Sequence, residues 1–96
     1  MNLTHLHYAL YALDLLANNR SVENFVFQKA LNGILEFLES DDLEGEYREL
    51  INENISVLYG AKNILKTYLE GGSCMNEIIE LNYIDFKNLI DEINSL

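Results

Sequence analysis

Apolar residues recur at spacings of three and four along most of the chain, and this pattern limits the fold more than any other feature. Near the amino terminus, Leu3, Leu6, Leu10, Leu13 and Ala17 would all lie on one face of a helix. No segment alternates convincingly with period two, so no β-sheet is expected. The chain also lacks proline, the residue that most strongly interrupts helices. The pattern predicts an all-α protein.

Four helical segments separated by short polar breaks are predicted. They cover about residues 3–18, 22–39, 42–70 and 73–93. The strongest stop signal between them is Gly71-Gly72, since glycine commonly ends helices. Helices of this kind bury their apolar faces against one another. We therefore expect one domain over residues 1–96, folded as a small antiparallel bundle of four helices.

The third segment is too long for a round fold. A continuous helix over residues 42–70 would measure about 43 Å, whereas a compact chain of this length is about 32 Å across. Either the bundle is elongated, or this helix breaks or protrudes. The candidate break points are Gly60 and the Asn52–Asn54 stretch, because both residue types form helices poorly. Asn82 is a candidate break in the last segment.

The chain is strongly acidic, with 16 acidic and 6 basic residues and a net charge of −10. Such a surface repels phosphate backbones and anionic membranes, so direct nucleic-acid or membrane binding is disfavoured. A basic protein partner is favoured, although acidity that serves solubility alone is the competing interpretation. Half of the acids fall within 18 residues: Glu36, Glu39, Asp41, Asp42, Glu44, Glu46, Glu49 and Glu53.

Part of this acidic cluster has an ordinary structural explanation. Asp41, Asp42 and Glu44 would cap the third helix and complement the positive end of its dipole. The others include acids at spacings of three and four, where like charges cost a few tenths of a kcal/mol per pair. An excess of acidic residues that lowers the stability of the helix predicts a partner-binding surface. Its predicted residues are Glu36, Glu39, Glu46, Glu49 and Glu53.

The first helix carries more apolar surface than one core-facing side requires. Tyr8 and Leu15 form a second stripe beside the first, and Tyr11 adds to it. A helix apolar around most of its circumference is central in a fold or lies at an interface. Tyrosine suits interfaces because its apolar ring ends in a hydroxyl. Tyr8, Tyr11 and Leu15 are therefore a candidate dimer or partner face, unless these tyrosines only border a small core.

No catalytic, metal or cofactor site is expected. His5 and His7 are two residues apart and would diverge by about 200° on a helix, so they cannot share a metal. An EF-hand loop in the acidic stretch would place Ile51 where a bidentate glutamate is required. Gly71-Gly72 lacks the lysine of a phosphate loop. Cys74 is the single cysteine and is interpreted as an inert thiol.

Location and function follow from these observations as hypotheses. A lone cysteine, no apparent signal peptide and no apolar run of about 20 residues predict a cytoplasmic protein. The leading hypothesis is a non-enzymatic protein that neutralises a basic partner, such as a nucleic-acid-binding enzyme or a toxin. Phage anti-defence inhibitors, immunity proteins and antitoxins are of this type. The alternatives are a structural or regulatory homodimer joined through the first helix, and a metal-storage or enzyme-accessory module.

Overall fold

The computed structural model describes residues 3–40 and 44–96, and this part of the chain forms five helices and no strand. The all-α prediction is confirmed, but the predicted number of four helices is wrong, because the third segment is divided in two. The helices are α1 (Thr4–Ala17), α2 (Asn24–Leu38), α3 (Gly45–Glu53), α4 (Ile55–Leu69) and α5 (Asn76–Asn94).

Asn54 divides the third predicted segment into α3 and α4. Its backbone angles, φ −113° and ψ 19°, lie outside the helical range. Its side-chain Nδ2 donates a hydrogen bond to the carbonyl of Leu50 at 2.9 Å. Asparagine competes with the helix in this way by bonding to nearby backbone groups. The break therefore falls at the predicted asparagine stretch.

Gly60 does not break the helix, and that prediction is wrong. It lies inside α4, where an added Cβ would approach Nδ2 of Asn82 to 2.8 Å. Asn82 does not interrupt α5 either, so the second predicted break is also wrong. Its Nδ2 donates to the carbonyl of Val57 on α4 at 3.1 Å. Both residues allow α4 and α5 to approach each other closely. Helix propensity describes a residue within its own helix and does not include such contacts between helices.

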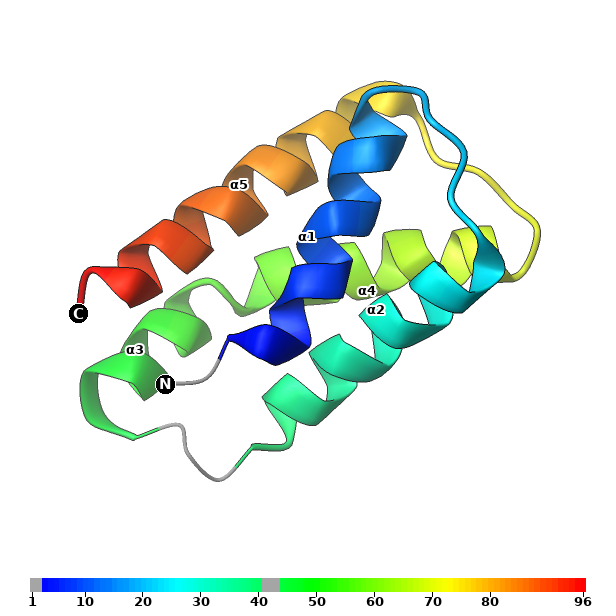
Figure 1. The fold of residues 1–96 in the computed structure, drawn as a ribbon. Coiled ribbons are helices and arrows are strands. Elements are labelled where there is room, and N and C mark those ends of the chain that lie inside the picture. Colours follow the sequence, from blue (N-terminus) through cyan, green and yellow to red (C-terminus); the bar gives the residue numbers. More distant parts are fainter. Residues whose placement is uncertain (1–2, 41–43) are drawn as a thin grey trace.

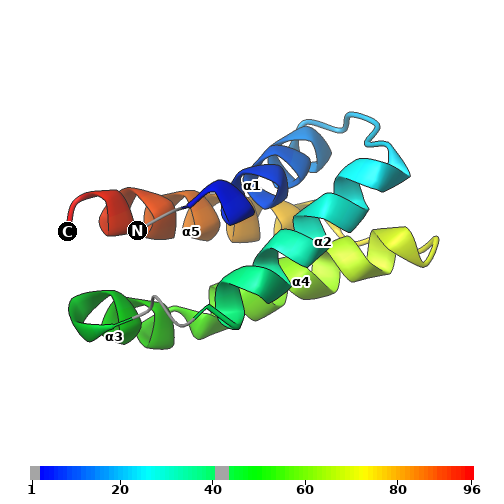
Figure 2. The same ribbon diagram turned by 60° about the horizontal axis from the view of Figure 1, so that its bottom comes forward.

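The helices pack antiparallel in three pairs: α1 with α2, α1 with α5, and α2 with α4. In Figure 2, α1 and α5 lie above α3 and α4, and α2 crosses between them. The carboxyl end of α5 lies at the same end of the molecule as α3 (Figures 1 and 2). The molecule measures 38 × 22 × 17 Å, so an elongated shape and a helix break, which were expected as alternatives, occur together.

The core is built from the predicted apolar stripes. Leu6 and Leu13 on α1 are completely buried, and so is Phe86 on α5. At the crossing of α1 and α2, a Cβ added to Gly33 would overlap the carbonyl oxygen of His5. Among the described residues, no polar or charged side chain is buried. Any binding chemistry in this part of the chain is therefore at the surface.

Candidate protein-interaction surfaces

The acidic strip consists of Glu46, Glu49 and Glu53 on α3. All three are exposed, and their spacing places them on one side of the helix. Only Ile51 of α3 is buried, and the helix packs mainly against α4. Within the described residues, none of the three carboxylates has an ion pair or a hydrogen bond. The strip is therefore a row of three unpaired carboxylates, and Arg48 is the one basic residue on α3.

Glu36 and Glu39, the other two residues of the predicted partner surface, lie on α2 and just after it. Oε2 of Glu36 is 3.0 Å from Nδ1 of His5 on α1. This contact directs the Glu36 side chain, which stays exposed, toward the junction of α1 and α2. Glu39 is the exposed C-cap residue of α2.

The predicted capping role is only partly visible. Glu44 is the N-cap residue of α3, but its side chain makes no capping hydrogen bond. Asp41 and Asp42 lie outside the described residues. Because α3 starts at Gly45, Glu44 stands at the helix start instead of inside the first turn, where a capping box would have placed it.

A second surface, which we call the aromatic cleft, lies between α1 and the start of α2. The cleft has a volume of about 370 Å³. The predicted face of Tyr8, Tyr11 and Leu15 forms its α1 side, and Tyr8 and Tyr11 are 42% and 54% exposed. The other lining residues are Ser21, Val22, Glu23, Phe25 and Val26.

The sequence pattern alone did not identify Phe25 as part of this cleft. It is 56% exposed. Phe25 is the second residue of α2, whereas the buried stripe begins at Val26 and Phe27. Its position beside the helix start is the only sequence signal that could have indicated its exposure.

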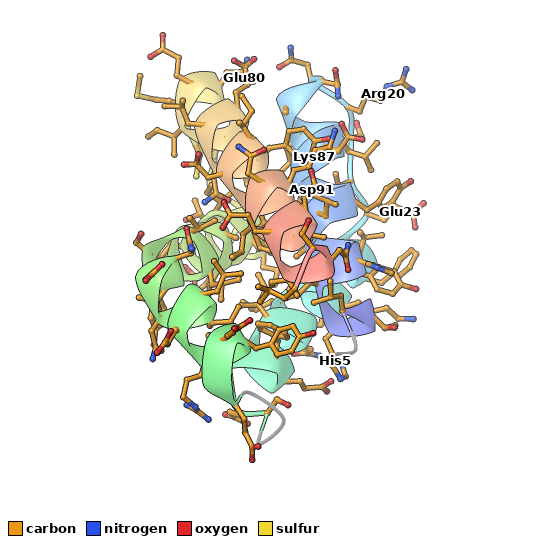
Figure 3. All side chains as sticks on the ribbon, turned by 90° about the vertical axis from the view of Figure 1, so that its left-hand side faces the viewer. His5, Arg20, Glu23, Glu80, Lys87 and Asp91 are labelled. Carbon is orange, nitrogen blue, oxygen red and sulfur yellow. The ribbon has the colours of Figure 1, made fainter. Side chains whose placement is uncertain are left out.

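Charges of both signs surround the aromatic cleft. Nζ of Lys29 lies 5.2 Å from the ring centroid of Tyr8, within the range of a cation–π contact. Lys29, His5 and Glu36 line an adjoining hollow of about 290 Å³ together with Tyr8. In Figure 3, His5, Arg20 and Glu23 lie on the α1 side of the molecule. This face is therefore more balanced in charge than the chain as a whole.

The remaining candidate groups are dispersed. His7 lines a small hollow with Tyr8 and Tyr11, separate from the hollow that contains His5. In the described ranges, no three His, Cys, Asp or Glu residues are grouped so that they could hold a metal ion. Cys74 is partly buried, and its backbone N–H donates to the Tyr68 hydroxyl at 3.4 Å.

No described helix has the length and apolar character needed to cross a membrane.

Comparison with protein-family models, with curated proteins and with solved structures finds no match for this chain. Its function must therefore be inferred from the chemistry of its own surfaces. The acidic strip and the aromatic cleft are built from exposed side chains of the kinds that contact macromolecules.

Proposed function

We propose that this chain is a non-enzymatic binding protein that contacts a basic protein partner through the acidic strip of α3. The observation that carries the proposal is the row of three exposed carboxylates, none of which is ion-paired within the described residues although Arg48 lies on the same helix. Like charges at these spacings oppose helix stability, whereas a cationic partner would relieve the repulsion. The net charge of −10 would also accelerate the encounter with such a partner.

The chemistry favours a partner that itself binds nucleic acid, or a cationic toxin. Proteins that bind nucleic acid present lysine and arginine to phosphates. An acidic protein can occupy that basic surface and block it. The expected biological roles are those of a phage anti-defence inhibitor, an immunity protein or an antitoxin, acting in the cytoplasm.

Removing the charges of the acidic strip should weaken partner binding. The variant Glu46→Gln, Glu49→Gln, Glu53→Gln keeps the size and helix propensity of each side chain. Exposed ion pairs contribute up to about 1 kcal/mol each, so we expect about tenfold weaker binding at low salt. The measurement is affinity capture from a lysate of the source cells, identification of the captured protein, and titration of that purified protein.

The matched control removes the same charge elsewhere, in the variant Glu70→Gln, Asp91→Asn, Glu92→Gln. These acids are exposed and lie outside α3. The control should bind nearly as well as the wild type. Equal weakening by both triple variants would mean that only net charge matters. Unchanged binding by the α3 variant, with no dependence on salt, would remove the basis of the proposal.

A second candidate function, a structural or regulatory homodimer joined through α1, is favoured by the aromatic cleft. Tyr8, Tyr11 and Phe25 expose large apolar surfaces beside one another. Two copies that meet there would not repel each other uniformly, because this face carries both a positive charge, on Lys29, and a negative charge, on Glu23. Isologous contacts of this kind are the commonest route to dimers.

Light scattering at micromolar concentration tests this second candidate. If a dimer forms through the aromatic cleft, Tyr11→Glu should shift it to monomer, because a carboxylate would be buried at the contact. Tyr59→Glu is the matched control: Tyr59 on α4 is 49% exposed and has Nζ of Lys62 5.7 Å from its ring centroid. A wild-type protein that is strictly monomeric would eliminate the homodimer.

A further inference from the structure

The first half of α5 displays exposed apolar side chains that the core does not use. We call the set Met75, Ile78, Leu81 and Ile84 the apolar strip. Each of the four is more than half exposed. Residues three apart on a helix are neighbours, so the strip is a continuous ridge about 14 Å long that winds around about half of the helix. Single exposed apolar residues are ordinary, whereas a contiguous group marks an interaction site.

The packing of α5 holds the apolar strip outward. Phe86 is buried on the side of the helix that contacts α1 and α4, about 140–160° around the helix from Leu81 and Ile84. Asn82 points toward α4, where its Nδ2 donates to the Val57 carbonyl at 3.1 Å. Turning Leu81 inward would break this bond and expose Phe86. Figure 1 shows α5 at the edge of the molecule, with no helix covering its outer side.

Carboxylates border the apolar strip. Glu77 and Asp85 are four residues before and after Leu81, and Glu80 is four residues before Ile84. All three acids are exposed. Figure 3 shows Glu80 near the start of α5, and Lys87, the single basic residue of this helix, further along it. The surface is therefore an apolar stripe between negatively charged margins.

We propose that the apolar strip binds a basic amphipathic helix of a partner protein. Apolar residues of that helix, repeating at three and four, would cover Ile78, Leu81 and Ile84. Lysine or arginine beside them would pair with Glu77, Glu80 and Asp85. This inference rests on the proposed function in one respect, namely that the partner is positively charged. It concerns a different surface, however, because the strip begins at the far end of α5 from α3 (Figures 1 and 2).

A second copy of the chain does not fit the apolar strip. In a twofold contact the same surface meets itself. Glu77, Glu80 and Asp85 of one copy would then face the same acids of the other. Like charges across an interface suppress association, and each copy also carries a net charge of −10.

The test uses a fluorescently labelled synthetic helix with leucines along one face and lysines on both edges. Fluorescence anisotropy should show binding to the wild-type protein. A peptide of the same composition, with its leucines distributed around the helix, should bind at least tenfold more weakly. The variant Leu81→Gln, Ile84→Gln should also lose about tenfold or more, the effect of exposing one or two buried aliphatic side chains.

Two further variants separate the apolar strip from general stickiness. Leu96→Gln alters a similarly exposed aliphatic residue beyond the far end of α5 and should leave binding of the labelled helix unchanged. Glu77→Gln, Glu80→Gln, Asp85→Asn should weaken binding several-fold at low salt and have less effect at high salt.

Three results would overturn the inference. The first is equal binding of both peptides, and the second is unchanged binding by Leu81→Gln, Ile84→Gln. The third is a wild-type dimer in sedimentation that this variant dissociates, which would assign the apolar strip to a second copy. None of these measurements uses the acidic strip, so they are independent of the α3 variant that tests the proposed function.

Discussion

Replacing Phe86 by alanine should lower the free energy of unfolding by about 3–5 kcal/mol. Phe86 is completely buried, and it lies on the side of α5 that packs against α1 and α4. The loss combines the transfer of a large aromatic side chain from the core with the cavity that it leaves. Domains of this size are stable by only about 5–15 kcal/mol, so this variant should be marginally folded at best. Urea denaturation monitored by circular dichroism measures the change.

Leu81→Ala is the matched control for Phe86→Ala. Leu81 is on the same helix but 64% exposed, so its replacement should change stability by less than about 0.5 kcal/mol. A large loss from Leu81→Ala would contradict the orientation of α5, or would show that another molecule covers the apolar strip in solution. A small loss from Phe86→Ala would contradict its place in the core.

Replacing Gly33 by alanine should lower the free energy of unfolding by about 1–2 kcal/mol. Alanine favours helix by about 0.5–1 kcal/mol over glycine, but the added Cβ would overlap the backbone carbonyl oxygen of His5. Backbone atoms cannot swing aside, so α1 must move away from α2, and over-packing of this kind typically costs 1–3 kcal/mol. These two helices form the most extensive pair in the fold. The shift in the urea midpoint, at constant slope, measures the loss.

Gly60→Ala makes the same chemical change inside α4 and is the control. There the nearest atom is Nδ2 of Asn82, the end of a side chain that can rotate. The gain in helix propensity then offsets much of the strain, and stability should stay within about 1 kcal/mol of the wild type. If the two glycine variants were equally stable, backbone contact between α1 and α2 could not be the reason for glycine at position 33.

The two surfaces differ in how far the sequence predicted them. Tyr8, Tyr11 and Leu15 were identified as one face from α1 alone, because residues at helical spacings share a face wherever the helix lies. The cleft that they line with Val22 and Phe25 was not predictable, since it depends on the packing of α2 against α1. Likewise, spacing placed Glu46, Glu49 and Glu53 together, whereas only the fold directs Glu36 toward His5.

The apolar strip was missed for a related reason. The apolar pattern of α5 includes both Ile78 and Ile79, and spacing alone does not show which of them faces the core. In the structure Ile79 is buried and Ile78 is 51% exposed. One helix cannot turn both residues inward equally, and the bond from Asn82 to Val57 sets the rotation.

The sequence by itself determined that the chain is helical, where most helices lie, and that it carries an acidic surplus and an over-apolar first helix. These are local properties, set by residues within about one helical turn of each other. The tertiary structure alone decided that Gly60 and Asn82 hold two helices together instead of ending them. It also decided that α5 turns Phe86 inward and leaves Leu81 outside. These choices depend on contacts between residues distant in the chain, and spacing within one helix carries no information about its neighbours.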